Sequence, residues 1–300
     1  MEKEISIVLQ LSKSEQTLLE MHSFLNVINV IISEIKILSM NFNKEKELKA
    51  LQDHCISIAR SLESLDSALE SARRIDKSEA YILSELHKHI GADNKHHPDY
   101  EYSIDNITSI FRILNVRVRE ILNRNEFPQD WSEFNISNLK DNIISVFNAI
   151  ELNSHGRYEI VYEATSHDIN RYLIDIIISS VDGKVIKMPS VFQDVIRDLM
   201  ANARKYTPPG GKIKAMLIDD GIKLSLAIID NGIGVPESQI EKIMQFGFRG
   251  DNTVNKITYG GGFGLTKAYY ITKRYNGRMW VDSELNKGTK IRIEIPRKSA

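Results

Sequence analysis

The chain is poor in several residues whose abundance would indicate particular classes of protein. Cysteine occurs once among the 300 residues, as Cys55. One thiol cannot form an internal disulfide framework, so the sequence excludes a disulfide-stapled secreted scaffold and favours a reducing compartment. Proline occurs seven times but is absent from residues 4 to 90. That stretch therefore lacks the residue that most strongly breaks helices.

Charge of one sign and long apolar runs are also missing. The 39 Lys and Arg residues balance 40 Asp and Glu residues, with a formal net charge of −1, which gives no bulk attraction to nucleic acid. The charged start, residues 1 to 4, lacks the apolar core of a signal peptide, and polar residues interrupt the nearest candidate for a membrane span, Met21 to Ser33. We therefore expect no nucleic-acid partner, no membrane span and a cytoplasmic location, for the whole protein or for the cytosolic part of a longer one.

Three short blocks near the C-terminus carry most of the functional signal. The first, residues 198 to 207 (DLMANARKYT), ends a helix predicted over about residues 190 to 206. Asp198 and Asn202 share one face of this helix, and Lys205 and Tyr206 follow on the same side. These side chains offer a carboxylate to orient or deprotonate a nucleophile, a Mg²⁺-ligand oxygen, a cation for phosphate and a flat surface for adenine. The alternative is the solvated face of an ordinary amphipathic helix.

The second block, Asp230 to Gly234 (DNGIG), follows a strand predicted from the alternation of residues 223 to 229. Asp230 then lies at the edge of the strand, where its carboxylate can accept a hydrogen bond from an exocyclic amine such as adenine N6. Gly232 and Gly234 permit close backbone approach and positive φ. The same composition occurs in plain turns, so this block alone leaves both interpretations open.

The third block, residues 260 to 265 (GGGFGL), runs into a predicted helix. Free backbone N–H groups at a glycine-rich helix start form a cradle for anions. The spacing is not that of the Walker motif, and no strand leads directly into it as in the dinucleotide-binding motif. Between Phe246 and Gly260, glycine, aspartate and asparagine residues favour a loop, which we expect to serve as a lid.

With residues 246 to 250 (FGFRG), these blocks resemble the N, G1, F and G2 boxes of sensor histidine kinases and related GHKL-type ATPases. Residues 288 to 296 (GTKIRIEIP) resemble the last strand of that ATP-binding domain, so the resemblance covers about residues 131 to 298. It implies an α/β sandwich of the Bergerat type with ATP and Mg²⁺ as cofactors. It also implies that Asn202 coordinates Mg²⁺, that Asp230 recognises adenine and that Thr289 lies near the adenine.

The resemblance further implies nucleotide, phosphate or lid contacts for other residues of these boxes: Lys205, Tyr206, Gly232, Gly234, Gly260, Gly262, Gly264 and Leu265. Many kinases carry Asn or Glu where this chain has Asp198. We take Asp198 as a catalytic residue on the chemistry of its carboxylate.

The N-terminal region has the pattern of a long helical hairpin. Apolar residues recur mostly at three- and four-residue steps from Leu9 to Leu38 and again from Leu48 to Leu69, with a polar break at residues 41 to 44. Two such arms cannot bury a wide apolar stripe alone, so we expect a homodimer that forms a four-helix bundle. A third helix, about residues 103 to 124, departs from the usual plan of histidine kinases.

The predicted fold class is therefore α+β, in three parts. Residues 1–90 form the helical hairpin for dimerisation and phosphotransfer, residues 91–130 form the extra helix and a linker, and residues 131–300 form the ATP-binding domain.

Residues 22 to 31 (HSFLNVINVI) resemble the H box of histidine kinases, with His22, Phe24 and Asn26 in matching places. The resemblance implies that His22 accepts the phosphoryl group and that Asn26 helps to position water during phosphatase action on a partner. A neutral imidazole is a competent nucleophile near pH 7. Ser23 departs from the pattern, since an acid is expected there to activate the imidazole. The alternative is a histidine on a bundle helix with no chemistry.

The sequence thus predicts an ATP-dependent protein histidine kinase of a two-component system. It would phosphorylate His22 and pass the group to an Asp of a response-regulator receiver domain, under the control of an upstream sensor protein. The runner-up is a dimeric signalling scaffold that binds ATP without autophosphorylation, which Ser23 and the extra helix favour. A third interpretation, a kinase of protein serine, fits the dimerising hairpin and its H-box-like segment less well.

Overall fold

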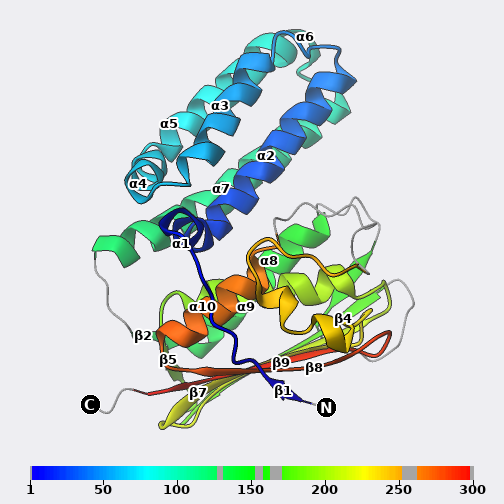
Figure 1. The fold of residues 1–300 in the computed structure, drawn as a ribbon. Helices are drawn as coiled ribbons and strands as arrows, with labels where there is room; N and C mark the ends of the chain where they lie inside the picture. The colour runs from blue at the N-terminus through cyan, green and yellow to red at the C-terminus, as the bar shows by residue number, and fades with distance from the viewer. Residues whose placement is uncertain (1, 127–130, 153–157, 163–170, 252–261, 298–300) are drawn as a thin grey trace. The chain divides into compact units, whose positions relative to one another are not determined.

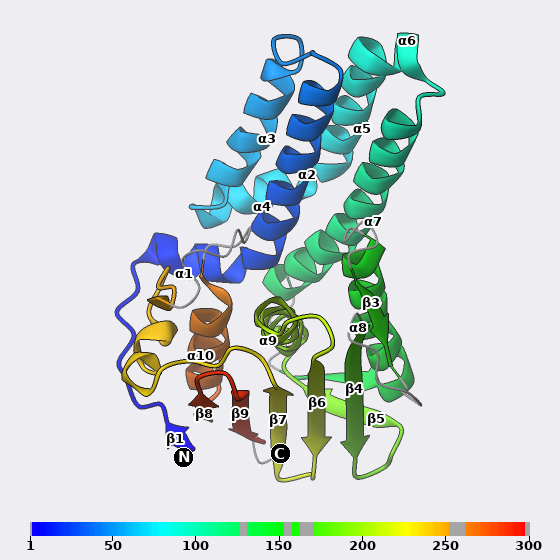
Figure 2. The same cartoon turned by 90° about the vertical axis from the view of Figure 1, so that its right-hand side faces the viewer.

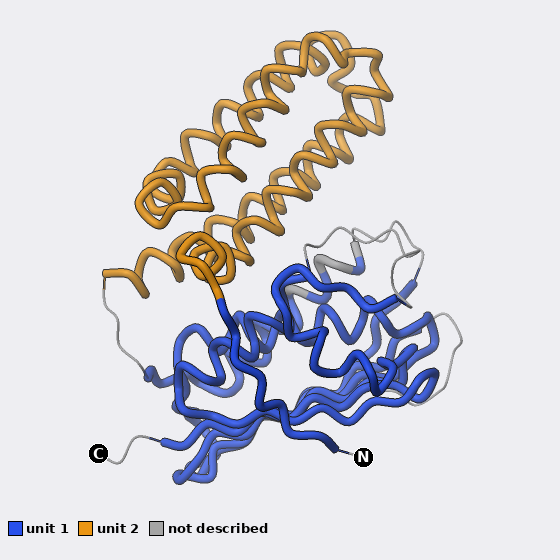
Figure 3. Tube along the Cα trace, viewed as in Figure 1, with its two compact units in different colours: residues 1–10, 129–257, 262–300 blue, residues 11–128, 258–261 orange. Residues whose placement is uncertain are grey.

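The computed structural model describes residues 2–126, 131–152, 158–162, 171–251 and 262–297. The chain divides into two compact units (Figure 3). The sheet unit combines residues 1–10 with residues 129–257 and 262–300, and the helical unit is formed by residues 11–128. The first ten residues, which the sequence led us to include in the hairpin, thus lie in the sheet unit.

One mixed sheet forms the sheet unit, and its described strands follow the order β1-β8-β9-β7-β6-β4-β3 (Figure 2). The bounds are β1 Lys3–Glu4, β3 Glu159–Val161, β4 Arg171–Ser180, β6 Lys212–Asp219, β7 Lys223–Asp230, β8 Arg278–Glu284 and β9 Gly288–Pro296. The β3–β4 and β4–β6 pairs are parallel, and the other pairs are antiparallel. A separate ribbon pairs β2 (Ser132–Asn135) with β5 (Val185–Met188).

The helices α8 (Ile136–Leu152), α9 (Phe192–Tyr206) and α10 (Gly264–Arg274) cover one face of this sheet (Figure 1). Short 3₁₀ turns, η2 (Glu237–Gln239) and η3 (Lys242–Met244), precede the third block. Strand side chains alternate between the two faces of the sheet, and the apolar residues of β7 that the sequence predicted to face inward, Leu224, Leu226 and Ile228, are buried in a single core with the helices. The predicted α/β sandwich is confirmed.

The N-terminal strand β1 completes one edge of the sheet. Its residues Lys3 and Glu4 pair with Val281 and Trp280 of β8. Ile5 follows and is fully buried in the core of the sheet unit, and its N–H donates to the carbonyl of Met279 at 2.9 Å. The inclusion of residues 1–10 in the helical hairpin was wrong, because Lys3 and Glu4 form a strand and Ile5 is buried in the core of the sheet unit.

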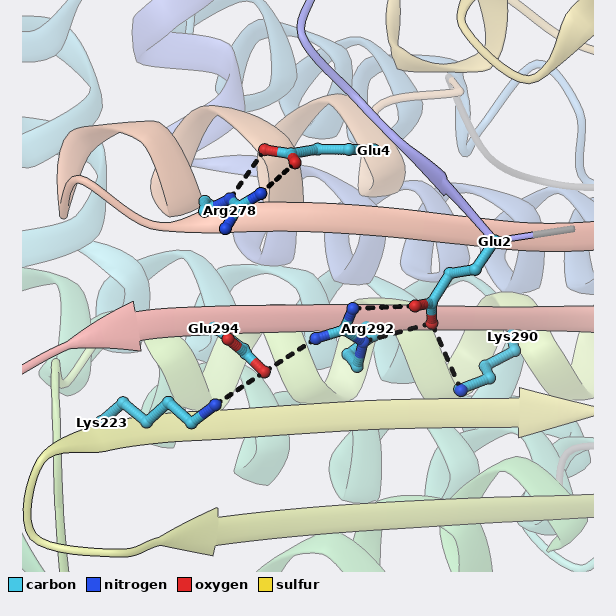
Figure 4. Close-up of polar contacts among 7 residues, drawn as sticks. All are labelled: Glu2, Glu4, Lys223, Arg278, Lys290, Arg292 and Glu294. Atoms are coloured by element: carbon cyan, nitrogen blue, oxygen red, sulfur yellow. Dashed lines mark hydrogen bonds and ion pairs between the residues drawn. The ribbon is translucent and has the colours of Figure 1, made fainter.

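Charged side chains join β1 to the sheet (Figure 4). Glu4 binds the guanidinium of Arg278, and Glu2 binds Arg292 at 2.8 and 3.1 Å and Lys290 at 3.3 Å. The hydroxyl of Tyr269 on α10 donates to the carbonyl of Ile7 at 2.8 Å. Exposed ion pairs contribute little to stability individually, so the burial of Ile5 contributes more than these pairs to holding the strand in place.

The helical unit contains one long apolar helix, α2, and a segmented return. Its elements are α1 Lys13–Glu20, α2 His22–Asn41, α3 Lys49–Ser61, α4 Leu65–Arg73, α5 Ile75–Leu86, the π-helix η1 His87–Gly91, α6 Ala92–Asn94 and α7 Pro98–Glu126. Ser12 caps α1 in a capping box with Glu15. The hairpin is therefore present, but its second arm is broken into several helices.

The extra helix α7 is longer than predicted and lies in the core of the helical unit. Ile28, Ile31 and Ile35 of α2 share one buried cluster with Phe111 and Leu114 of α7. The helix α7 pairs with α2 more extensively than any other helix of the described unit does. The apolar stripe that led us to expect a second copy is thus covered by α7 of the same chain.

By length and hydropathy alone, α2 is long and apolar enough to cross a membrane, and among the described residues it is the one helix that is. Its mean hydropathy over the relevant window is 1.5. Core helices of soluble proteins have the same property, and seven residues of α2 are buried in the bundle. The sequence analysis did not identify α2 as a possible span, because it considered only apolar runs without polar residues.

Candidate nucleotide-binding site

The first and third blocks meet where α9 lies against the start of α10. The apolar face of α9, including Val195, Leu199 and Met200, is buried in the core, so its polar face is left beside α10. An added Cβ on Gly264, the first residue of α10, would lie 2.8 Å from the Nδ2 atom of Asn202 and 3.7 Å from the Cβ of Asp198. The structure therefore brings the predicted metal ligand and the glycine-rich helix start together.

The second block is held against α9 and against the last strand. Asp230 pairs with Thr289 across β7 and β9, and its Oδ1 accepts the N–H of Gly232 at 2.8 Å. Burial raises the pKa of Asp230 to about 6, although hydrogen bonds from the backbone N–H groups of Gly232 and Thr289 oppose the shift. A partly buried acceptor at this place suits recognition of an amine, because a ligand N–H group replaces lost water.

Both glycines of the second block are required by close contacts. An added Cβ on Gly232 would lie 2.4 Å from the carbonyl oxygen of Tyr206, at the end of α9. Gly234 has φ of +65°, and its Cβ would lie 2.0 Å from the carbonyl oxygen of Glu284. The block is thus a tightly packed turn that also carries the candidate adenine acceptor. The sequence alone had left both interpretations, plain turn and binding element, open.

Thr289 takes part in a hydroxyl network that the sequence did not predict. Its Oγ1 lies 2.9 Å from the Oγ of Ser283, which accepts the N–H of Val235 at 2.8 Å. The side chain of Ser283 therefore connects the end of the second block with the last strand.

A cationic group lies at the end of α9. Burial, together with the positive charges of Arg249 and Arg204, lowers the pKa of Lys205 to about 8. Arg249 also forms a hydrogen bond with Tyr206, whose pKa burial raises. Arg249 lies within residues 246 to 250, and no role was predicted for it from the sequence. Its signal was a cation directly after the aromatic residues of that block.

A buried ionic cluster between α9 and α10 was also not predicted from the sequence. The ammonium group of Lys267 lies 3.3 Å from Asp198 Oδ2 and 3.4 Å from Asp194 Oδ2. Arg197 binds Asp194 as well. Asp198, predicted as a catalytic carboxylate, thus forms an ion pair inside the protein. The signal was a lysine on the buried face of α10, between Thr266 and Ala268.

The remaining predicted residues of the third block are divided by what the structure describes. Gly262 has φ of +75°, and Leu265 packs partly buried against the core. Phe246 stacks on Phe263 with ring centroids 4.5 Å apart. Gly260 and the predicted lid beyond residue 251 lie outside the described residues. Within the described ranges, no group of three or more His, Cys, Asp or Glu side chains is arranged to hold a metal ion.

His22 and Asn26 lie one helical turn apart at the start of α2 in the helical unit. His22 is the first residue of α2, and its Nε2 is 3.1 Å from Nδ2 of Asn26. The residue is only 5% exposed. The Oγ of Ser23 is buried without a hydrogen-bond partner, and a serine at this position supplies no carboxylate.

Residues 189–299 match the family model of histidine kinase-, DNA gyrase B- and HSP90-like ATPases. This part of the chain is therefore similar to ATPase domains of that family. The individual proteins that match this chain include sensor kinases, and these matches cover 35% to 36% of the chain.

Two such relatives are named as sensor kinases. The chain is 34% identical over 116 residues to the adaptive-response sensory kinase SasA of Rippkaea orientalis, covering 36% of this chain and 29% of the relative. It is 31% identical over 106 residues to the sensor histidine kinase WalK of Bacillus subtilis, covering 35% and 17%. The chain thus spans less than a third of these relatives.

Among solved structures, the catalytic domain of the histidine kinase ThkA aligns with a TM-score of 0.41 and 22% identity, covering 57% of this chain and 100% of that domain. The mycobacterial sensor histidine kinase MprB aligns with a TM-score of 0.39 and 18% identity, covering 56% and 99%.

Proposed function

We propose that this protein is an ATP-dependent protein histidine kinase of a two-component system. The observation that carries the proposal is the approach of Asn202 to Gly264, with Asp230 and Thr289 paired on the adjoining strands. This arrangement supplies a phosphate-binding end and an adenine-binding end from elements of one family domain. The names of the similar sensor kinases support the type of reaction.

The residues at the phosphate end fit Mg²⁺ and ATP. Asn202 provides an amide oxygen, the ligand type that Mg²⁺ takes together with water and phosphate. Gly264 leaves open the space beside that amide, which a Cβ would fill at 2.8 Å from Nδ2. Lys205 and the first-turn amides of α10 would bind phosphate oxygens. A bound Mg²⁺ ion would neutralise charge on the transferring group.

The residues at the adenine end fit a purine with an exocyclic amine. Asp230 would accept the N6 amine, Tyr206 would offer an apolar surface, and Gly232, Gly234, Gly262 and Leu265 would shape the walls of the site. Asp198 lies 3.3 Å from the ammonium group of Lys267, and its carboxylate would orient or deprotonate the nucleophile.

His22 is the proposed acceptor. A ring nitrogen would attack the γ-phosphorus, so that an N–P bond forms, the bridging P–O bond to the β-phosphate breaks, and ADP leaves. If the amide of Asn26 donates across the 3.1 Å contact, Nε2 holds the lone pair and Nδ1 carries the proton. Reaction at Nε2 requires this contact with Asn26 to open. Because His22 is also only 5% exposed, we expect slow autophosphorylation.

The partners follow from the same proposal. A response-regulator receiver domain would take the phosphoryl group, Asn26 would position water in the reverse phosphatase reaction, and an upstream sensor protein would supply the signal. We propose a cytoplasmic location and the division into residues 1–90, 91–130 and 131–300. Homodimerisation stays a prediction. It would need a surface other than the apolar stripe on which it was based, because α7 already covers that stripe.

A scaffold that binds ATP without autophosphorylation is the second candidate. The burial of His22 and the absence of an acid at Ser23 favour it.

Incubation with γ-labelled ATP separates the two candidates. A kinase should acquire a label that is labile in acid and stable in base, and His22→Ala should lose it while retaining ATP binding. His54, on α3 of the same unit, provides the matched control, since His54→Ala should keep the label. Absence of label in the wild type, with ATP still bound, would contradict the kinase and support the scaffold.

A further inference from the structure

The buried ionic cluster of Lys267, Asp194 and Asp198 is unusual for its position. Lys267 is fully buried and Asp194 is 1% exposed. Burying charge is costly, and buried ion pairs often add little net stability compared with apolar residues of similar size. Their best-attested use is to fix one arrangement of packed elements. The arrangement to be fixed here is that of α9 against α10.

The cluster adjoins the proposed phosphate end of the nucleotide site. Lys267 lies one turn after Gly264 on α10, and Asp198 lies one turn before Asn202 on α9. Gly264 itself packs against both Asp198 and Asn202. The ion pair from Lys267 to Asp198 therefore joins the two helices within a turn of the two residues proposed to meet Mg²⁺ and phosphate.

We propose that Lys267 is a positioning residue of the nucleotide site. Its ammonium group holds the first turn of α10 in register with Asn202 and keeps Asp198 oriented as an anion. This inference rests on the proposed ATP site. The adenine end is built by Asp230 and Thr289 on β7 and β9, whereas the ion pairs of Lys267 run to α9. Loss of Lys267 should consequently affect phosphate binding selectively.

The charge balance of the cluster suggests the variants. K267M keeps the length of the side chain but removes the cation that Asp194 and Asp198 share. The double variant D194N/K267M removes one charge of each sign and leaves the carboxylate of Asp198 without the ammonium group of Lys267. The matched control is D194N alone, which keeps the ion pair between Lys267 and Asp198. Each variant is made in the full chain.

Calorimetry with Mg·ATP and with adenosine separates positioning from a general structural effect. In K267M and in D194N/K267M, we expect ATP affinity to fall about tenfold or more, which corresponds to about 1.4 kcal/mol, while adenosine affinity changes less than about twofold. D194N should keep the wild-type ratio of the two affinities. A merely structural role would lower both affinities together.

Three results would overturn the inference. They are equal losses for ATP and adenosine, an unchanged ATP affinity in both lysine variants, or unfolding of both variants at 25 °C, which would assign the ion pair to stability. Failure of the proposed ATP site is distinguishable, because it would appear as absence of ATP binding in the wild type and would overturn both proposals. Absence of label with ATP still bound would contradict only the kinase.

Discussion

Asp230 is the residue whose environment most directly affects the chemistry of the adenine end. Burial raises its pKa to about 6 from an ordinary value of 3.8. The free protein therefore takes up a proton on this carboxyl as the pH falls through about 6. By linkage, ionised Asp230 lowers the stability of the folded state above about pH 6, and this penalty is relieved as the pH falls toward 4.

We predict that adenosine affinity decreases as the pH is lowered below about 6, because the amine of adenine favours the ionised carboxylate. Adenosine has no phosphate whose titration would confuse the result. Asp230→Asn should bind more weakly, by about 1–3 kcal/mol, and should lose the pH dependence. Calorimetry between pH 5 and 7.5 tests this, and an equal slope in the variant would contradict the assignment.

The pKa of Lys205 is shifted in the opposite direction, since burial and two neighbouring arginines lower it to about 8. Below that pH it is protonated and can bind phosphate. We predict that ATP affinity falls as the pH rises from 7 to 9, and that Lys205→Met is weaker at pH 7 and nearly flat over this range. The exposed Lys212 supplies the control, because Lys212→Met should retain the wild-type slope.

At His22, the missing acid gives a third prediction. Ser23→Glu should increase autophosphorylation if the kinase geometry is present, because general-base assistance is worth about 10²–10⁴-fold. Phosphorylation is measured as acid-labile label per mole of protein. Ser33→Glu, on the same helix but away from His22, is the control, and an equal increase there would mean that added charge alone is responsible.

The candidate site residues in the blocks could be predicted because residue type and short-range spacing indicate what each side chain can bind. Asn202, Asp230 and Gly264 are recognisable by type and spacing, and the structure brings Asn202 and Gly264 together. Lys267 could not be predicted in this way, because its burial depends on Asp194 and Asp198 of another helix. A lysine in a helix is ordinarily solvated, and only packing of α10 on α9 makes it an interior group.

At the scale of elements, helix α9 and strand β7 were predicted almost to the residue, since each buries one face with the period of its type. The strand β1 was not, because two paired residues give too short a pattern and the acidic start resembles a first helical turn. The position of this segment depends on Ile5, whose hydrogen-bond partner Met279 is far away in the sequence.

The role of Ile5 can be tested at this scale. Ile5→Ala should destabilise the sheet unit by about 2–5 kcal/mol, because it removes a fully buried side chain. Val8 is 85% exposed, so Val8→Ala should change stability by less than about 0.5 kcal/mol. The measurement is urea unfolding of the full chain followed by tryptophan fluorescence, since Trp280 lies on β8. Equal effects of both changes would refute the role of the strand.

At the scale of the whole molecule, the helical unit buries its apolar stripe within one chain through α7. The sequence pattern of α2 could not reveal which helix covers it, because a second copy and a later helix of the same chain present equally suitable apolar faces. Some apolar side chains remain exposed on α2 and α7, namely Ile37, Met40 and Val116.

Light scattering of the full chain tests the dimer prediction. If a dimer forms through this surface, Met40→Asp should weaken it, whereas Tyr81→Asp, on α5, should leave the mass unchanged. A monomer at micromolar concentration would contradict the homodimer without affecting the ATP site.

The position of β1 also sets an order of events during synthesis. Lys3 pairs with Val281, so the ribosome must make every residue up to β8 before β1 finds its partner. At about 5–20 residues per second, that delay is on the order of tens of seconds. The helical unit, whose described helices end at Glu126, can fold during this interval. The residues of β1 are therefore made before the helical unit but join the sheet after it, and Ile5 and Ile7 stay exposed to chaperones and proteases until β8 and β9 have been translated.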